Sequence, residues 1–169
     1  MRDRTHRKAR RVIVGTDGEG ASTVIADAPS PETVLPNGII LHEVWQQRTL
    51  PAGVDDQPDE DWTLGPAAPA EGAVVRILTV PAATARPSAP DLHSDPSLHV
   101  ITMLEGELDV VLENGRVTLD PGDTIVLRDS RHDLDNRYPR PARFVYTSFP
   151  LADGPSAASS AAKTGALST

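Results

Sequence analysis

The sequence predicts an all-β domain with the architecture of a sandwich or a barrel. Two observations carry this prediction: short runs of β-branched residues follow one another closely, and tight-turn signals separate them. In addition, 16 prolines and 12 glycines disfavour long helices. The chain has 169 residues and no internal repeat, so we expect one barrel of ordinary domain size.

The N-terminal third of the sequence predicts strands in addition to those of the strand-rich half at 73–150. Val12–Val14 and Thr23–Ile25 flank the Gly-rich link TDGEG, which is typical of a β-hairpin. The run GIILHEVWQ, from Gly38, predicts another strand. Residues 51–72 are acidic and rich in Pro and Gly, so we expect a long loop that acts as a lid or is only a mobile insertion.

The strongest strand signal runs from residue 73 to residue 150. Asn114-Gly115 predicts a tight hairpin turn, and DPGD at 120–123 predicts a second turn. The strands expected around these turns are AVVRILTV, HVITML, ELDVVL, VTL, TIVL and RFVYTSF. We therefore expect a basic N-terminal arm at 1–10, a single domain at 11–152 with its core at 73–150, and a disordered tail of small polar residues at 153–169.

Composition excludes several classes of function. A net charge of −8 disfavours nucleic acid and anionic membranes as partners, and 4% aromatic residues argue against a stacking surface for single strands. Six basic residues in the first dozen are a local exception, which we interpret as a solvated arm. Without cysteine there can be no disulfide or thiol nucleophile. No apolar run has the length of a signal peptide or a membrane span, so we expect a cytoplasmic protein.

Three of the five histidines lie in the strand-rich half, and their spacing suggests a metal site. Asp95 follows His93 by two residues, so both side chains can lie on one face of an extended segment. His99 opens a predicted strand, and His132 precedes another one. Imidazoles from separate strands, together with a carboxylate, suit Mn, Fe, Co, Ni or Zn. Spacing alone is a weak signal, because a single histidine in a β-protein is more often structural.

The segment from Leu92 to Asn136 resembles the paired motifs of the cupin superfamily. The first motif has His-x-His, three or four residues, Glu, six residues and Gly; here the corresponding residues are His93, Asp95, His99 and Gly106. The second motif begins with Pro-Gly-Asp and ends in a histidine followed, after three residues, by Asn. Pro121-Gly122-Asp123, His132 and Asn136 match that pattern, with about one residue fewer between its ends.

The resemblance implies a double-stranded β-helix, the jelly-roll barrel of the cupins, with extra N-terminal strands. It also implies one divalent metal ion near the barrel axis, with His93, Asp95, His99 and His132 as its ligands. Asp and His replace the usual His and Glu at two of these positions. Asp95 is therefore either a fourth ligand or an uncoordinated base, and a metal-free cupin that kept its histidines stays an alternative.

Three further residues are candidates for the substrate site. Arg76 lies within a strand and either pairs with a substrate carboxylate or faces solvent, which the pattern favours. Tyr146 either presents its hydroxyl to the cavity as a catalytic group or fills the core. Met103 alternates with His99 and is expected to give the pocket an apolar floor. Asn136 is expected to bond backbone near the second motif.

These expectations lead to a metal-dependent enzyme acting on a small oxygenated molecule. The metal would serve as a Lewis acid, and Asp95 could move a proton during dehydration, isomerisation or decarboxylation. Two alternatives stay open: an Fe(II) dioxygenase of the cupin type, and a non-catalytic module that binds a small ligand. Small cupins commonly share edge strands, so we also expect a homodimer.

Overall fold

The computed structural model describes residues 8–53, 56–58, 69–83 and 90–152, and its regular secondary structure is almost entirely strand. The N-terminal arm before residue 8, most of the acidic loop and the C-terminal segment from 153 lie outside the described residues. The strands are β1 (Arg10–Thr16), β2 (Ser22–Pro29), β3 (Glu32–Val34), β4 (Ile40–Gln47), β5 (Ala73–Val80), β6 (Ser97–Glu105), β7 (Leu108–Leu112), β8 (Gly115–Leu119), β9 (Thr124–Arg128), β10 (His132–Asp135) and β11 (Ala142–Pro150).

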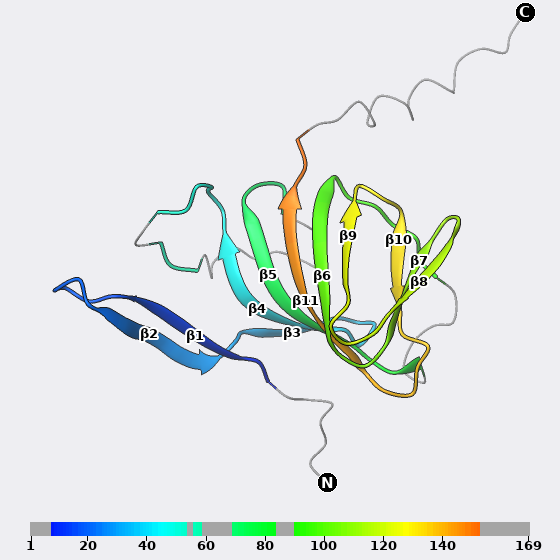
Figure 1. The fold of residues 1–169 in the computed structure, drawn as a ribbon, viewed down its shortest axis with the longest axis horizontal. Helices are drawn as coiled ribbons and strands as arrows, with labels where there is room; N and C mark the ends of the chain where they lie inside the picture. The colour runs from blue at the N-terminus through cyan, green and yellow to red at the C-terminus, as the bar shows by residue number, and fades with distance from the viewer. Residues whose placement is uncertain (1–7, 54–55, 59–68, 84–89, 153–169) are drawn as a thin grey trace, which may run out of the picture.

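Two antiparallel sheets form the barrel (Figure 1). The larger sheet has six strands in the order β3-β4-β5-β11-β6-β9, and the smaller has three in the order β10-β7-β8. In both β6 and β11, buried residues alternate with partly exposed ones, as expected when one face of a sheet covers a core. The buried apolar cluster joins residues of both sheets, among them Phe144 and Ile101 from the larger and Val110 and Leu108 from the smaller.

The predicted strands are confirmed, with two additions. The sequence analysis did not predict β3 or β10, which have three and four residues. All three residues of β3 are exposed, and β10 reads HDLD, so neither gives the apolar alternation from which strands are predicted. The all-β prediction is confirmed.

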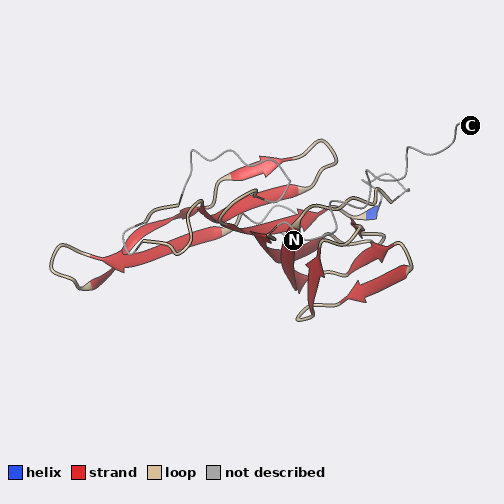
Figure 2. Cartoon of the chain, turned by 90° about the horizontal axis from the view of Figure 1, so that it is seen from above, coloured by secondary structure: helices blue, strands red, loops and turns tan. Residues whose placement is uncertain are grey.

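Strands β1 and β2 form a two-stranded sheet of their own, which projects from the barrel (Figures 1 and 2). The extra N-terminal strands are therefore confirmed. Valine and isoleucine side chains on this hairpin are exposed, among them Val14 at 62% and Val24 at 57%, which lie directly opposite each other. The expected homodimer stays a prediction.

The two turn glycines of the motifs lie where the backbone requires them. Gly106 has φ 75° between β6 and β7, and Gly122 has φ 98° between β8 and β9. Gly122 donates its N–H to the Met103 carbonyl, and Met103 donates to the Asp123 carbonyl, so the Pro-Gly-Asp turn is tied to β6. The turns therefore help to fix β6, the strand that carries His99.

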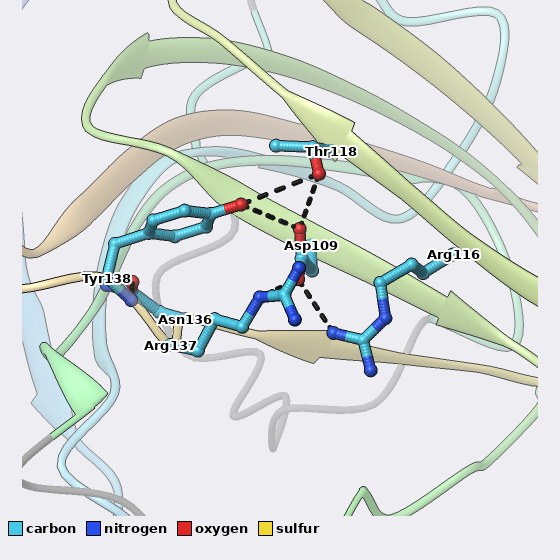
Figure 3. A network of polar contacts seen from close by, with 6 residues as sticks. All are labelled: Asp109, Arg116, Thr118, Asn136, Arg137 and Tyr138. Atoms are coloured by element: carbon cyan, nitrogen blue, oxygen red, sulfur yellow. Dashed lines mark hydrogen bonds and ion pairs between the residues drawn. The ribbon is translucent and has the colours of Figure 1, made fainter.

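A buried carboxylate organises the smaller sheet (Figure 3). Asp109, fully buried on β7, accepts bonds from Arg116 Nη1 at 2.8 Å, Thr118 Oγ1 at 2.7 Å and Tyr138 Oη at 3.0 Å. Its Oδ2 also pairs with Arg137 Nε at 2.6 Å. We call these five residues the Asp109 cluster. It joins β7 and β8 to the segment that follows β10.

The residues that the structure describes contain no helix with the length and apolar character of a membrane span.

Candidate metal centre

The register of the larger sheet places polar side chains in its buried interior. His99 on β6 lies opposite Ser148 on β11, and in the next row Tyr146 of β11 lies opposite Arg76 of β5. All four of these residues are buried. The sheet therefore directs an imidazole, two hydroxyls and a guanidinium toward one interior region.

A backbone bridge brings His93 beside His132. The N–H of each residue donates to the carbonyl of the other, at 3.0 and 2.9 Å, and their ring centroids lie 4.9 Å apart. His99 joins them from the other sheet, with its ring 5.8 Å from that of His132. Two imidazoles six residues apart thus lie together with a third from 33 residues further along the chain, and His93 is exposed whereas the other two are buried.

Asp95 completes this group, which we call the histidine cluster (His93, Asp95, His99 and His132). Its Oδ1 lies 2.9 Å from His99 Nε2, and its side chain is 25% exposed. That oxygen is closed to solvent, yet it has no hydrogen-bond partner, so the pair is close without the alignment of a hydrogen bond. Asp95 is thus held in the cluster by its close contact with His99.

The ring nitrogens that face away from the cluster are held by acceptors. Nδ1 of His93 lies 3.1 Å from the Asp91 carbonyl, and Nδ1 of His132 lies 2.7 Å from the Ser130 carbonyl. A carbonyl only accepts, so both Nδ1 atoms carry the proton, which leaves each Nε2 with a lone pair in the neutral ring. This is the usual arrangement of a metal-binding histidine.

His99 is held in a different way, by hydroxyl groups. Its Nδ1 lies 2.8 Å from Tyr146 Oη and 3.1 Å from Ser148 Oγ. Burial lowers the pKa of His99, and the nearby Asp95 carboxylate partly opposes that shift. Burial raises the pKa of Tyr146 to about 12, so its hydroxyl keeps the proton at neutral pH. Tyr146 thus packs in the buried apolar cluster, which the core-filler alternative predicted, and its hydroxyl also bonds His99.

Arg76 is buried rather than solvent-facing, so the interpretation that the sequence favoured is wrong. Its side chain is 1% exposed, and its Nε donates to Glu43 Oε2 at 2.9 Å. Both terminal nitrogens, Nη1 and Nη2, are closed to solvent and have no hydrogen-bond partner. The prediction from strand alternation failed here because Arg76 belongs to the inward row of β5, where an apolar residue is usual.

The donor set fits a transition metal, although its atoms are not gathered around one point. Among the described residues, no group of three or more His, Asp or Glu side chains is arranged to hold an ion as it stands. His99 Nε2 instead faces Asp95 Oδ1, at a separation close to the roughly 3 Å between two neighbouring ligand atoms on one octahedral ion. Two imidazoles on such an ion have centroids about 4.5 to 6.4 Å apart, and both ring spacings of the cluster lie in that range.

The remaining predicted residues have separate positions. Met103 shares the inward face of β6 with His99, but it lies two rows away and packs in the apolar core opposite Phe144. Its contact with substrate stays a prediction. Asn136 donates to the carbonyls of Val80 and Arg140, at 3.2 and 2.8 Å, which confirms its role in bonding backbone.

Sequence reasoning missed Glu43, Gln46 and Ser148. Glu43 follows Leu41 with the period of a strand, so its inward position could have been inferred from the alternation. Gln46, whose buried Oε1 has no partner, lies beyond an irregularity between Glu43 and Trp45 that reverses the alternation. No sequence signal predicts that irregularity.

A separate hollow of about 1000 Å³ lies at the base of the projecting hairpin. It is lined by residues of β1, β2 and the segment after β4, among them Arg11, Ile13 and Gln47. None of its lining residues belongs to the histidine cluster. The chemistry of the cluster, and not the size of this hollow, locates the candidate site.

No protein-family model matches the chain, and no curated protein sequence matches it. Several solved structures are similar to the chain in fold. The cupin domain of Cnp3 from Schizosaccharomyces pombe has a TM-score of 0.52 at 10% identity, over 88% of this chain and 99% of that one. The polyketide cyclase RemF from Streptomyces resistomycificus has a TM-score of 0.48 at 15% identity, over 75% and 77%. A sugar phosphate isomerase from a cupin superfamily, from Silicibacter pomeroyi, has a TM-score of 0.46 at 15% identity, over 72% and 70%. The similarity to Cnp3 shows that the chain has the cupin fold, as predicted, and it shows the fold alone.

Proposed function

We propose that this cupin is a metal-dependent enzyme that acts on a small oxygenated organic molecule by lyase or isomerase chemistry. One observation carries the proposal: His93, Asp95 and His99 lie beside His132, which is far from them in the sequence. Their side chains are of the types that bind Mn, Fe, Co, Ni or Zn.

The four residues of the histidine cluster would hold the ion. His93 and His132 offer Nε2 lone pairs, because their Nδ1 atoms donate to backbone carbonyls. His99 can offer its own Nε2 when its Nδ1 donates to the hydroxyl of Tyr146 or Ser148. When bound, a divalent ion supplies Lewis acidity, which polarises a carbonyl or hydroxyl oxygen.

The chain's own groups would handle the proton. If the three histidines alone hold the ion, Asp95 is the uncoordinated base: it is partly open to solvent and beside His99, so its carboxylate can accept a proton from a substrate carbon or hydroxyl and return it. Tyr146, with a pKa of about 12, keeps its proton and would orient His99 as a positioning residue. The catalytic role that the sequence suggested for Tyr146 stays a prediction.

Elemental analysis of protein expressed without a metal-binding tag tests the proposal. We expect about one divalent ion per chain in the wild type and its loss in His132→Ala. His42→Gln is the matched control, because His42 is also buried but lies on β4, outside the cluster. Reconstitution with Co(II) adds an optical spectrum that reports the ligand set. A wild type that takes up no stoichiometric metal from any of the five ions would overturn the proposal.

Oxygen consumption distinguishes the proposed chemistry from its main alternative. We expect turnover of candidate substrates by the metal-loaded protein under anaerobic conditions. Turnover that requires O₂ and Fe(II) would instead assign a dioxygenase. Ligand binding that survives without any turnover across the substrates tested would assign a non-catalytic module.

A further inference from the structure

The guanidinium of Arg76 is a buried group with most of its hydrogen-bonding capacity unused. Arginine has five N–H donors, and in this structure Nε serves Glu43 while Nη1 and Nη2, which carry the other four, have no partner. A buried charged donor without an acceptor is strongly unfavourable, so such a group calls for a missing acceptor. The two terminal nitrogens form the planar fork that binds a carboxylate in bidentate fashion.

Sheet register places Arg76 two strands and one row from His99, with β11 and its Tyr146 between them. Arg76 lies directly opposite Tyr146 on the neighbouring strand, and the Tyr146 hydroxyl contacts His99 at 2.8 Å. A ligand held by Arg76 would therefore be adjacent to the proposed metal centre.

The register also gives an order of depth. Along β6 the inward residues are Ser97, His99 and Ile101, and Ile101 shares its row with Tyr146 and Arg76. The solvent-exposed end of the cluster is at His93. A ligand that enters there meets the histidines first and Arg76 one row deeper.

When a divalent ion is bound, the charges of this region favour an anion. Arg76 and Glu43 neutralise each other, and a divalent ion bound with Asp95 and three neutral imidazoles leaves a charge of +1. One carboxylate on the ligand would neutralise it. A dianion would leave an excess negative charge in a buried region, which is unfavourable.

We propose that the substrate is a small monocarboxylate with a second oxygen function, whose carboxylate binds Nη1 and Nη2 of Arg76 while its other oxygen faces the histidine cluster. This inference rests on the proposed function for the second contact only. The first contact needs no metal, and the two can be tested separately.

The first arm of the experiment uses metal-free protein and NMR titration with propanoate and with propanamide, a neutral molecule of the same shape. We expect propanoate to bind about 10- to 100-fold more tightly, as is typical of a charge-assisted bidentate contact. The variant Arg76→Met/Glu43→Met removes the ion pair as a unit and should lose the preference. Glu43→Gln keeps the guanidinium, so this variant should still prefer propanoate.

Equal binding of propanoate and propanamide by the wild type would overturn the proposal, and would mean that ordered water fills the fork. A preference for propanoate that survives in the double variant would also overturn it. Circular dichroism of each variant shows whether the barrel is folded.

The second arm compares 3-hydroxypropanoate with propanoate, in metal-loaded and metal-free protein. We expect the added hydroxyl to tighten binding only when metal is present. If the first arm succeeds and the protein takes up no metal, the proposed function fails and the carboxylate site stands. If metal binds and the hydroxyl has no effect, the claim that both sites hold one substrate is wrong.

Discussion

Two buried polar regions of this barrel differ in how completely their hydrogen bonds are made. The Asp109 cluster on the smaller sheet surrounds one buried carboxylate with four donors from arginine, threonine and tyrosine side chains (Figure 3). In the larger sheet, Arg76 uses one of its five N–H groups, and Asp95 Oδ1 has no hydrogen-bond partner. A complete network stabilises a fold, whereas an incomplete one costs stability and so indicates a site that awaits a ligand.

Loss of the central carboxylate is expected to have the largest effect on stability. Asp109→Ala should lower the free energy of unfolding by about 3 kcal/mol, because it leaves several donors without their shared acceptor. Urea unfolding measures the change. Glu113→Ala is the control: its pair with Arg131 is more than half exposed, so we expect a loss below about 1 kcal/mol. Equal losses in the two variants would remove the basis for treating the Asp109 cluster as structural.

Replacing the incomplete pair should have the opposite sign. Arg76→Met/Glu43→Met exchanges a poorly satisfied buried ion pair for apolar groups of similar volume, so we expect the free energy of unfolding to rise by about 1 to 2 kcal/mol. Arg76→Met alone should destabilise the fold, because it leaves the Glu43 carboxylate without its partner. A double variant that is clearly less stable than the wild type would show that Arg76 is a structural residue.

Tyr146→Phe sharpens the comparison at the histidine cluster. The variant removes the hydroxyl that contacts His99 Nδ1, and we expect metal affinity to fall about tenfold. Competition with a metal-binding dye measures that affinity. Thr147→Val, on the outward face of the same strand, should bind metal as the wild type does. Unchanged affinity in Tyr146→Phe would assign the hydroxyl to the fold alone.

The smallest expected effect is on the acid limb of the stability curve. Burial would raise the pKa of Asp109, but hydrogen bonds from Thr118, Arg116 and Tyr138 and the charge of Arg137 lower it overall. The folded state therefore binds this proton at a lower pH than the unfolded chain does. The contribution is complete above an unfolded pKa of about 3.9 and is lost as pH falls through the folded pKa.

Asp109→Asn should therefore show a flatter decline in the free energy of unfolding than the wild type below about pH 5. Urea unfolding at several pH values measures both slopes. An identical slope in the two proteins would contradict the direction of the shift.

Much of the fold follows from local physics, which is why the sequence predicts it. Short strands flank Asn114-Gly115 and Pro121-Gly122, and both turns place glycine at a positive φ. The histidine residues could be selected because their spacing matches a known pattern. The environment of Arg76 could not be predicted. An inward arginine depends on Glu43, which lies 33 residues away in the sequence and which sheet register brings opposite Arg76. Unmade hydrogen bonds are properties of three-dimensional packing and have no sequence signal.

The most direct test of the account is an anomalous difference map from a crystal grown with Co(II). We predict one strong peak per chain, within bonding distance of Nε2 of His93, His99 and His132 and beside an oxygen of Asp95. The Asp109 cluster should show none, since its carboxylate is already surrounded by donors. A map without a peak at the histidines would contradict the central claim, whether or not Co(II) binds elsewhere in the crystal.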